Sequence, residues 1–198
     1  MTMWDELRAQ VGEHLGSQDA PWEPPGCDDF RCCKVMAFDP SLSATGWVHL
    51  LVHRLGRQHR IALLAKGTLR VRTGRSGYLG TYERATLVKT LVEEVIWRGH
   101  DGHEPSAIAW EAPAVRGHRL ESSLIAGLMV YQACGGKGTV IQANHASALL
   151  TGSPAHDKGA IGAAVARYVP GAQSRVWNHN ERDALAIALA YALDLDGD

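Results

Sequence analysis

Residues 36–48 constrain the fold of this chain more than any other stretch. A β-capable run ends in Asp39, a turn of Pro40 and serines follows, and a second β-rich run begins just after Gly46. Pro40 cannot continue a central strand, and we expect Gly46, which tolerates either sign of φ, to let the chain turn back tightly. The pattern predicts a β-hairpin that holds one carboxylate at a strand end. Taken alone, it fits a structural turn as well as a metal or phosphate site.

The order of predicted elements indicates an α/β domain. Alternating or continuous apolar runs predict strands at residues 32–38, 45–53, 60–71, 107–110 and 139–141. Helical spacing is expected over residues 81–98, 120–129, 144–150, 158–168 and 184–195. Three successive strands followed by strands that alternate with helices predict a mixed five-stranded sheet, three strands antiparallel and two parallel, flanked by helices. Residues 31–198 would form this domain.

The first thirty residues have a different character. Trp4, Leu7, Val11 and Leu15 recur at helical spacing, and a Pro-rich linker follows them. We expect residues 1–30 to form an N-terminal helical appendage that packs on its own core or on a second copy of the chain.

Composition restricts the function classes only weakly. The chain has 20 Lys and Arg against 21 Asp and Glu, so a nucleic-acid partner would have to be attracted by local basic clusters. The four cysteines show no paired C-x-x-C spacing, and Cys32 and Cys33 are expected to be buried, reduced thiols in the first strand. Together with the lack of a long apolar run or signal peptide, this predicts a cytoplasmic protein without a membrane partner.

Two further acids repeat the placement of Asp39. Glu111 ends the apolar run at residues 107–110, and Asp183 stands in the first turns of the last predicted helix. Carboxylates that end central strands are costly unless a cation neutralises them. Mg²⁺ takes oxygen ligands, and two such ions about 4 Å apart can clamp the attacking and leaving oxygens of a phosphodiester. The acids therefore suggest a metal-dependent phosphodiesterase.

Four segments resemble RuvC-type Holliday-junction resolvases, which belong to the ribonuclease-H-like superfamily. In chain order they are FDPSLSATGW at 38–47, WEAP at 110–113, LTGSPAHDK at 150–158 and NERDALAIA at 180–188. The resemblance covers residues 32–193 and leaves the first thirty residues outside. It implies a ribonuclease-H-like fold and an endodeoxyribonuclease that resolves branched DNA.

The resemblance also implies roles for individual residues. Asp39 would bridge two Mg²⁺ ions per site, with Mn²⁺ as a substitute, and Glu111 and Asp183 would complete their ligand shells. Lys158 would be the fourth catalytic residue, with its charge near the scissile phosphate. Asn180 departs from the family, which commonly has an acid or a histidine there. Its neutral amide oxygen, on the same helix face as Asp183, would be a weaker metal ligand.

Some of these residues also have plain structural interpretations. Asp157 is suited to cap the helix that begins at Lys158, which would leave the lysine solvated. Glu181 and Asn178 have the spacing of a capping box, so Glu181 is expected to cap the last helix rather than bind metal.

Basic and aromatic residues outside the acid cluster predict the DNA contacts. Residues 70–80 are expected to form a flexible basic loop, whereas the basic hairpin tip at 53–60 is expected to be a solvated turn. The predicted DNA-binding residues are Arg72, Arg75, Tyr78, Arg116, Arg119 and Lys158. Two symmetric cuts in a junction imply a two-fold homodimer, and residues 122–133, with Gly127 for close approach, are the predicted interface helix.

Three other interpretations compete with the junction resolvase. A related ribonuclease-H-like enzyme would act on RNA or flap DNA, and a catalytically weak junction-binding protein would explain Asn180. An actin-like or sugar-kinase ATPase also uses an Asp followed by a Ser/Thr-rich turn. Such enzymes stack two domains around the nucleotide, and this chain of 198 residues shows no second copy of the motif.

Overall fold

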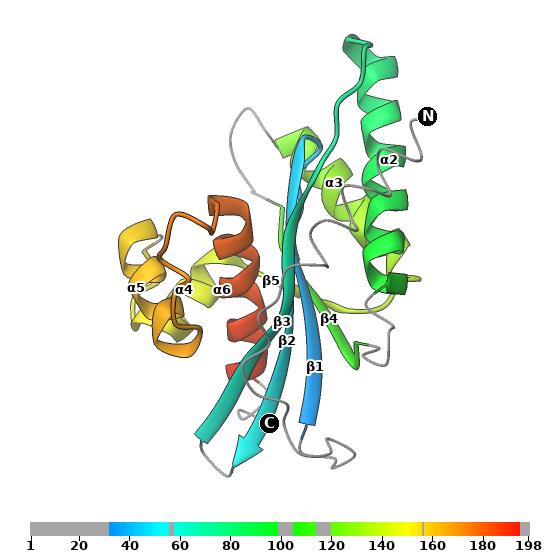
Figure 1. The fold of residues 1–198 in the computed structure, drawn as a ribbon. Helices are drawn as coiled ribbons and strands as arrows, with labels where there is room; N and C mark the ends of the chain where they lie inside the picture. The colour runs from blue at the N-terminus through cyan, green and yellow to red at the C-terminus, as the bar shows by residue number, and fades with distance from the viewer. Residues whose placement is uncertain (1–31, 56–57, 99–104, 114–119, 156, 195–198) are drawn as a thin grey trace.

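The protein is built on one five-stranded sheet with helices on both faces (Figure 1). The computed structural model describes residues 32–55, 58–98, 105–113, 120–155 and 157–194. The strands are β1 (Cys32–Asp39), β2 (Ala44–Leu55), β3 (Gln58–Arg70), β4 (Ala107–Glu111) and β5 (Thr139–Ile141). The helices are α2 (Gly77–Arg98), α3 (Leu120–Ala133), α4 (Ala143–Thr151), α5 (Lys158–Tyr168) and α6 (His179–Asp194).

The sheet has the strand order β3-β2-β1-β4-β5. β1, β2 and β3 pair antiparallel, and β4 and β5 run parallel to β1. This is the predicted mixed sheet, and it confirms the ribonuclease-H-like fold class. Because β1 and β4 are parallel neighbours, the residues at their carboxyl ends lie at the same edge of the sheet.

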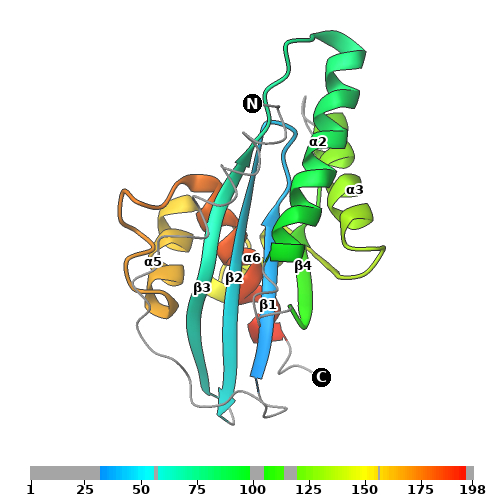
Figure 2. The ribbon, with the colours of Figure 1, turned by 45° about the vertical axis from the view of Figure 1, so that its right-hand side comes forward.

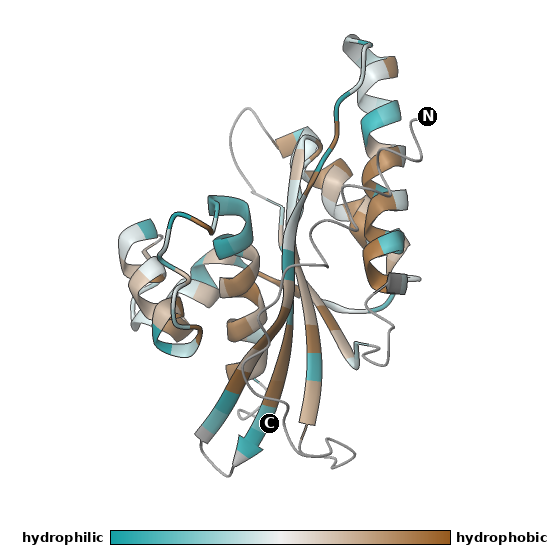
Figure 3. Ribbon diagram, viewed as in Figure 1, coloured by the Kyte–Doolittle hydropathy of each residue, from teal (hydrophilic) through white to brown (hydrophobic). Residues whose placement is uncertain are grey.

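Helices α2 and α3 cover one face, and α4, α5 and α6 cover the other (Figure 2). The α6 core buries Val35 and Ala37 of β1, whereas the α2/α3 core buries Met36 and Phe38. Hydrophobic residues concentrate in the strands, in α6 and in the part of α2 beside the sheet, and the first turns of α6 are hydrophilic (Figure 3). Strict alternation along β1 thus places Asp39 on the α6 side.

A bulge in β3 changes which residues face α6. His49 pairs with Ala65 but Leu50 pairs with Leu63, so the register shifts at Leu64. Leu63 packs in the α6 core before the bulge, whereas Ala65 packs in the α2/α3 core after it. An extra residue in one strand reverses the faces of all that follow. Lys66 and Thr68 consequently face α6.

Two local predictions were wrong. α2 begins at Gly77, so Tyr78 lies in a helical turn rather than in a flexible loop. Gly80 fits there because a Cβ on it would lie 2.3 Å from the carbonyl oxygen of Arg75, which shows that its role is close packing. The expected hairpin tip is mostly strand, since pairing continues to Leu55 and Gln58.

The two cysteines of β1 are less buried than the sequence predicts. Cys32 and Cys33 are reduced cysteines that are only partly buried, because they lie at the start of β1, away from the centre of the sheet. The predicted appendage at residues 1–30 lies outside the described residues. Among the helices that the structure describes, none is long and apolar enough to cross a bilayer.

Candidate active site at the carboxyl edge of the sheet

The ends of β1 and β4 bring two carboxylates together. Phe38 pairs with Trp110, so Asp39 and Glu111 follow in register on adjacent parallel strands. Alternation places both side chains on the α6 side, because Ala37 and Ala109, two residues earlier in each strand, are in the α6 core. Both acids therefore lie at strand ends, as the sequence predicted.

Gly46 lets the start of α6 reach this edge. It lies in β2 directly opposite Asp39, so it belongs to the strand and does not form the tight turn expected from the sequence. A Cβ on Gly46 would lie 2.1 Å from the carbonyl oxygen of Asn180. Glycine is required because the backbone of α6 rests directly on the backbone of β2.

We expect Gly46→Ala to destabilise the protein by about 1–3 kcal/mol, the usual cost of overpacking. The overlap is with backbone atoms, so α6 must move and carry Asp183 away from Asp39. Thermal unfolding measures this effect. Gly162→Ala is the matched control, because a Cβ on Gly162 in α5 meets nothing within 4 Å. Equal stability of the Gly46→Ala variant and the wild type would contradict the proposed contact.

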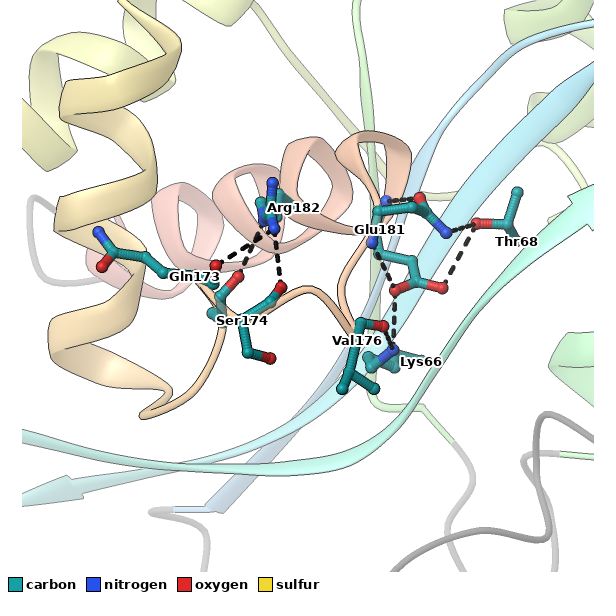
Figure 4. A network of polar contacts seen from close by, with 9 residues as sticks. Lys66, Thr68, Gln173, Ser174, Val176, Glu181 and Arg182 are labelled. Atoms are coloured by element: carbon teal, nitrogen blue, oxygen red, sulfur yellow. Dashed lines mark hydrogen bonds and ion pairs between the residues drawn. The ribbon is translucent and has the colours of Figure 1, made fainter.

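A polar network fixes the first turn of α6 on β3 (Figure 4). The amide of Glu181 donates to Asn178 Oδ1 at 3.1 Å, and the amide of Asn178 donates to Glu181 Oε2 at 3.3 Å. This confirms the predicted capping box. Lys66 Nζ lies 2.7 Å from Glu181 Oε2 and 4.7 Å from the ring centroid of Trp177. Thr68 accepts a hydrogen bond from Asn178 Nδ2 at 2.8 Å.

Arg182 ties the preceding loop to α6. Its guanidinium donates to the carbonyl oxygens of Ala172 and Ser174, each at 2.9 Å, and to that of Gln173 at 3.4 Å (Figure 4). Glu181 and Arg182, the two residues before Asp183, thus both stabilise the start of α6. Asp183 is left to face Lys158, whose Nζ lies 3.6 Å from Asp183 Oδ2.

Lys158 reaches the acids from the start of α5. Asp157 caps this helix, since its side chain accepts hydrogen bonds from the amides of Gly159 and Ala160, as the sequence predicted. The lysine side chain is 65% exposed. It is therefore a solvent-accessible cation beside a largely buried carboxylate, placed where an incoming anion can reach it.

The electrostatics show that the four groups interact. Burial, and then repulsion from Glu111 and Asp183, raise the pKa of Asp39 well above its ordinary value, although Lys158 opposes the shift. Burial, followed by repulsion from Asp183, raises the pKa of Glu111 to about 7. One lysine does not balance three acids in a partly desolvated site. The cluster is therefore short of positive charge.

The donor set suits a hard divalent cation. Asp39, Glu111 and Asp183 present only carboxylate oxygens, which Mg²⁺ prefers, and a cation would supply the missing positive charge. In the described part of the chain, no group of three or more His, Cys, Asp or Glu side chains is already arranged to hold a metal ion. The chemistry of the ligands fits, and binding would have to draw the carboxylates closer.

The other predicted site residues do not all lie near the acids. The backbone and Cβ of Asn180 pack against Gly46, next to the acids. Arg72, Arg75 and Tyr78 are all exposed at or near the start of α2, and Arg75 pairs with Glu83 at 2.9 Å. Arg116 and Arg119 lie outside the described residues.

Sequence reasoning missed Lys66 and Thr68 altogether. Both lie on β3 and bind the cap of α6, and their only sequence signal is polarity inside a long β-rich run. That signal is ambiguous, because polar residues also mark the solvent face of a strand.

Fold and site together define a class: a ribonuclease-H-like α/β domain with three carboxylates and a lysine at one sheet edge. No family model and no curated protein sequence matches the chain. Among solved structures, Thermus thermophilus RuvC is similar with a TM-score of 0.68 at 22% identity, over 83% of this chain and 96% of that one. The same protein in complex with a Holliday junction substrate gives 0.65 at 22% identity, over 82% and 94%. The chain therefore has the fold of RuvC.

Proposed function

We propose that this protein is a divalent-metal-dependent endonuclease that cuts branched DNA, with four-way junctions as its preferred substrate. The observation that carries the proposal is the register of β1 and β4, which sets Asp39 beside Glu111 in a RuvC fold, with Asp183 and Lys158 completing the cluster. The similarity to a protein solved on a Holliday junction supports the substrate class.

In the proposed chemistry, Asp39, Glu111 and Asp183 would hold the metal, with the amide of Asn180 as a neutral fourth ligand. Bound Mg²⁺, with Mn²⁺ as a substitute, would supply an activated water and stabilise charge on the phosphate. Lys158 would bind the scissile phosphate from the solvent side. Its positive charge would stabilise the negative charge that develops on the phosphate during cleavage. Burial of Asp39 and Glu111 would exclude bulk water from the cleavage position.

Cleavage of a defined substrate panel tests this function. The wild-type chain would be incubated with a four-way junction, a flap, a linear duplex and an RNA–DNA hybrid, each with Mg²⁺ or with EDTA. We expect Mg²⁺-dependent cutting of the junction above all others. Preference for the hybrid or the flap would favour a related nuclease, and junction binding without any cutting would favour the catalytically weak binding protein.

The DNA path would follow the exposed start of α2. Arg72, Arg75 and Tyr78 lie there, and Tyr78 is 84% exposed, so its ring can stack on a base. Together with Lys158, and with Arg116 and Arg119 from the segment after β4, they would form the proposed DNA-binding set.

The second copy of the chain would dock on α3. Ala126, Gly127 and Val130 face inward, and a Cβ on Gly127 would lie 3.3 Å from Pro113, so this glycine serves packing within the chain. The opposite side presents Leu124, Leu128 and Tyr131, which are 49%, 50% and 45% exposed. These residues recur at helical spacing as one apolar stripe, the form of surface that a symmetric dimer buries.

We expect Leu128→Arg to convert a dimer into a monomer, because two copies of the new charge would meet at a two-fold axis. Analytical ultracentrifugation measures the change. Val176→Arg is the control, since Val176 is 78% exposed and far from α3 in the chain. A monomeric wild type, or a dimer that tolerates Leu128→Arg, would rule out α3 as the interface.

A further inference from the structure

A half-open cavity of about 420 Å³ lies beside the proposed active site, on the α2/α3 face of the sheet. One wall is the β1–β2 turn directly after Asp39, and α2 and α3 form the others. Its polar lining comprises Ser41, Ser43, Thr81, Arg84, Glu121 and Ser122. Hydroxyl groups and a guanidinium are donors suited to an anion.

Arg84 supplies a half-buried charge that has no acidic partner among the described residues. Its Nη1 donates to Thr73 Oγ1 at 3.4 Å and its Nη2 donates to Thr81 Oγ1 at 3.3 Å. Within the described part of the chain it makes no ion pair, whereas neighbouring Arg75 is paired with Glu83. Neutral hydroxyls orient the guanidinium but leave its charge unbalanced. An arginine held in this way favours a phosphate, which it can bind in a bidentate manner.

The β1–β2 turn presents its hydroxyls in a rigid frame. Thr45 Oγ1 donates to the carbonyl oxygen of Ser41 at 2.8 Å, and the amide of Ser41 donates back to Thr45 Oγ1 at 3.1 Å. The hydroxyls of Ser41 and Ser43 lie 3.2 Å apart. The turn therefore has little conformational freedom to lose when a ligand binds.

The start of α3 adds a third favourable element. Glu121 and Ser122 lie in the first turn of this 14-residue helix, at the end that carries partial positive charge. Glu121 opposes an anion, and among the described residues that line this cavity it is the one with an acidic side chain. Its presence provides an internal test, because removing its charge should strengthen anion binding.

We propose that this cavity binds a backbone phosphate of the DNA strand that is cut, one that neighbours the scissile phosphate. This inference rests on the proposed nuclease function. Asp39 faces the α6 side, and the turn that follows it lines the cavity on the other side. A DNA strand that crosses this edge of the sheet would therefore contact both Asp39 and the cavity. The bound phosphate would set the register in which the next one reaches Asp39, Glu111 and Asp183.

Equilibrium binding of the full chain in EDTA, to a four-way junction and to a linear duplex, tests the cavity. We expect Arg84→Gln to weaken binding about tenfold and to lower the salt slope by about one phosphate contact. Glu121→Gln should tighten binding, and Lys137→Gln, an equal charge change at an exposed position at the amino end of β5, should have little effect. Arg84→Lys keeps the positive charge but lacks the planar guanidinium, so it separates the effect of charge from that of bidentate binding. Thermal unfolding checks that each variant folds.

Neutral methylphosphonate substitutions then locate the contact. One phosphate position should weaken wild-type binding when neutralised but leave Arg84→Gln binding unchanged. If the wild type cuts junctions while Arg84→Gln behaves like Lys137→Gln, the cavity proposal fails and the nuclease proposal stands. If Arg84→Gln weakens binding but the wild type neither prefers nor cuts junctions, the cavity binds a DNA phosphate and the nuclease proposal fails. A wild type that binds no DNA overturns both, and weaker binding by Glu121→Gln would also overturn the cavity proposal.

Discussion

Asp39→Asn is expected to slow junction cleavage by about a hundredfold to a thousandfold, the range for loss of one preorganised charged group in an active site. The amide keeps the size of the carboxylate, so the fold should be retained. It removes a carboxylate whose pKa is raised by repulsion from both other acids of the proposed site, so metal affinity falls as well. Single-turnover cleavage at saturating Mg²⁺ measures the chemical step.

Binding provides the control for this variant. Junction affinity in EDTA should be equal to or higher than that of the wild type, because Asp39→Asn removes an acid that repels phosphate. Asp157→Asn is a matched substitution at the α5 cap, where the amide oxygen can still accept from Gly159 and Ala160. It should cut normally. Undiminished cutting by Asp39→Asn would show that the site has been assigned to the wrong residues.

The metal-free protein is expected to lose stability as pH rises from 5 to 8. The pKa of Glu111 is raised to about 7 in the folded chain, mainly by burial, from an ordinary value of 4.5. A raised carboxyl pKa means that the folded state favours the proton, so the stabilisation is complete below pH 4.5 and is lost through pH 7. At about 1.4 kcal/mol per pKa unit, the loss from Glu111 is roughly 3 kcal/mol. Asp39 acts in the same direction.

Thermal unfolding in EDTA at several pH values measures this loss. Glu111→Gln removes the titrating group, so its stability should depend less on pH and exceed that of the wild type at pH 8. Comparing the two proteins isolates the contribution of Glu111, because every other titratable group is the same in both. Mg²⁺ should raise the stability of the wild type at pH 8 more than it raises that of Glu111→Gln. Identical pH profiles for the two proteins would contradict the electrostatic account.

Much of this site follows from short-range rules. The two-residue period of a strand places Asp39 and Glu111 on one face, and parallel pairing brings their strand ends together, so recognising the strands predicts the pair of acids. The capping signals at Asp157 and Asn178 are equally local, and the structure confirms both. Glycines were harder to interpret, because the same residue serves a turn, a helix start or a close contact.

The sequence alone determined the order of the elements, the mixed sheet and the acids at its edge, because periodicity and capping depend only on neighbouring residues. Tertiary structure alone decided that Gly46 admits the backbone of α6, that the bulge at Leu64 turns Lys66 toward Glu181, and that Arg84 lines a cavity beside Asp39. Each of these depends on contacts between residues far apart in the chain. Such contacts follow from how the layers pack, and no local pattern records them.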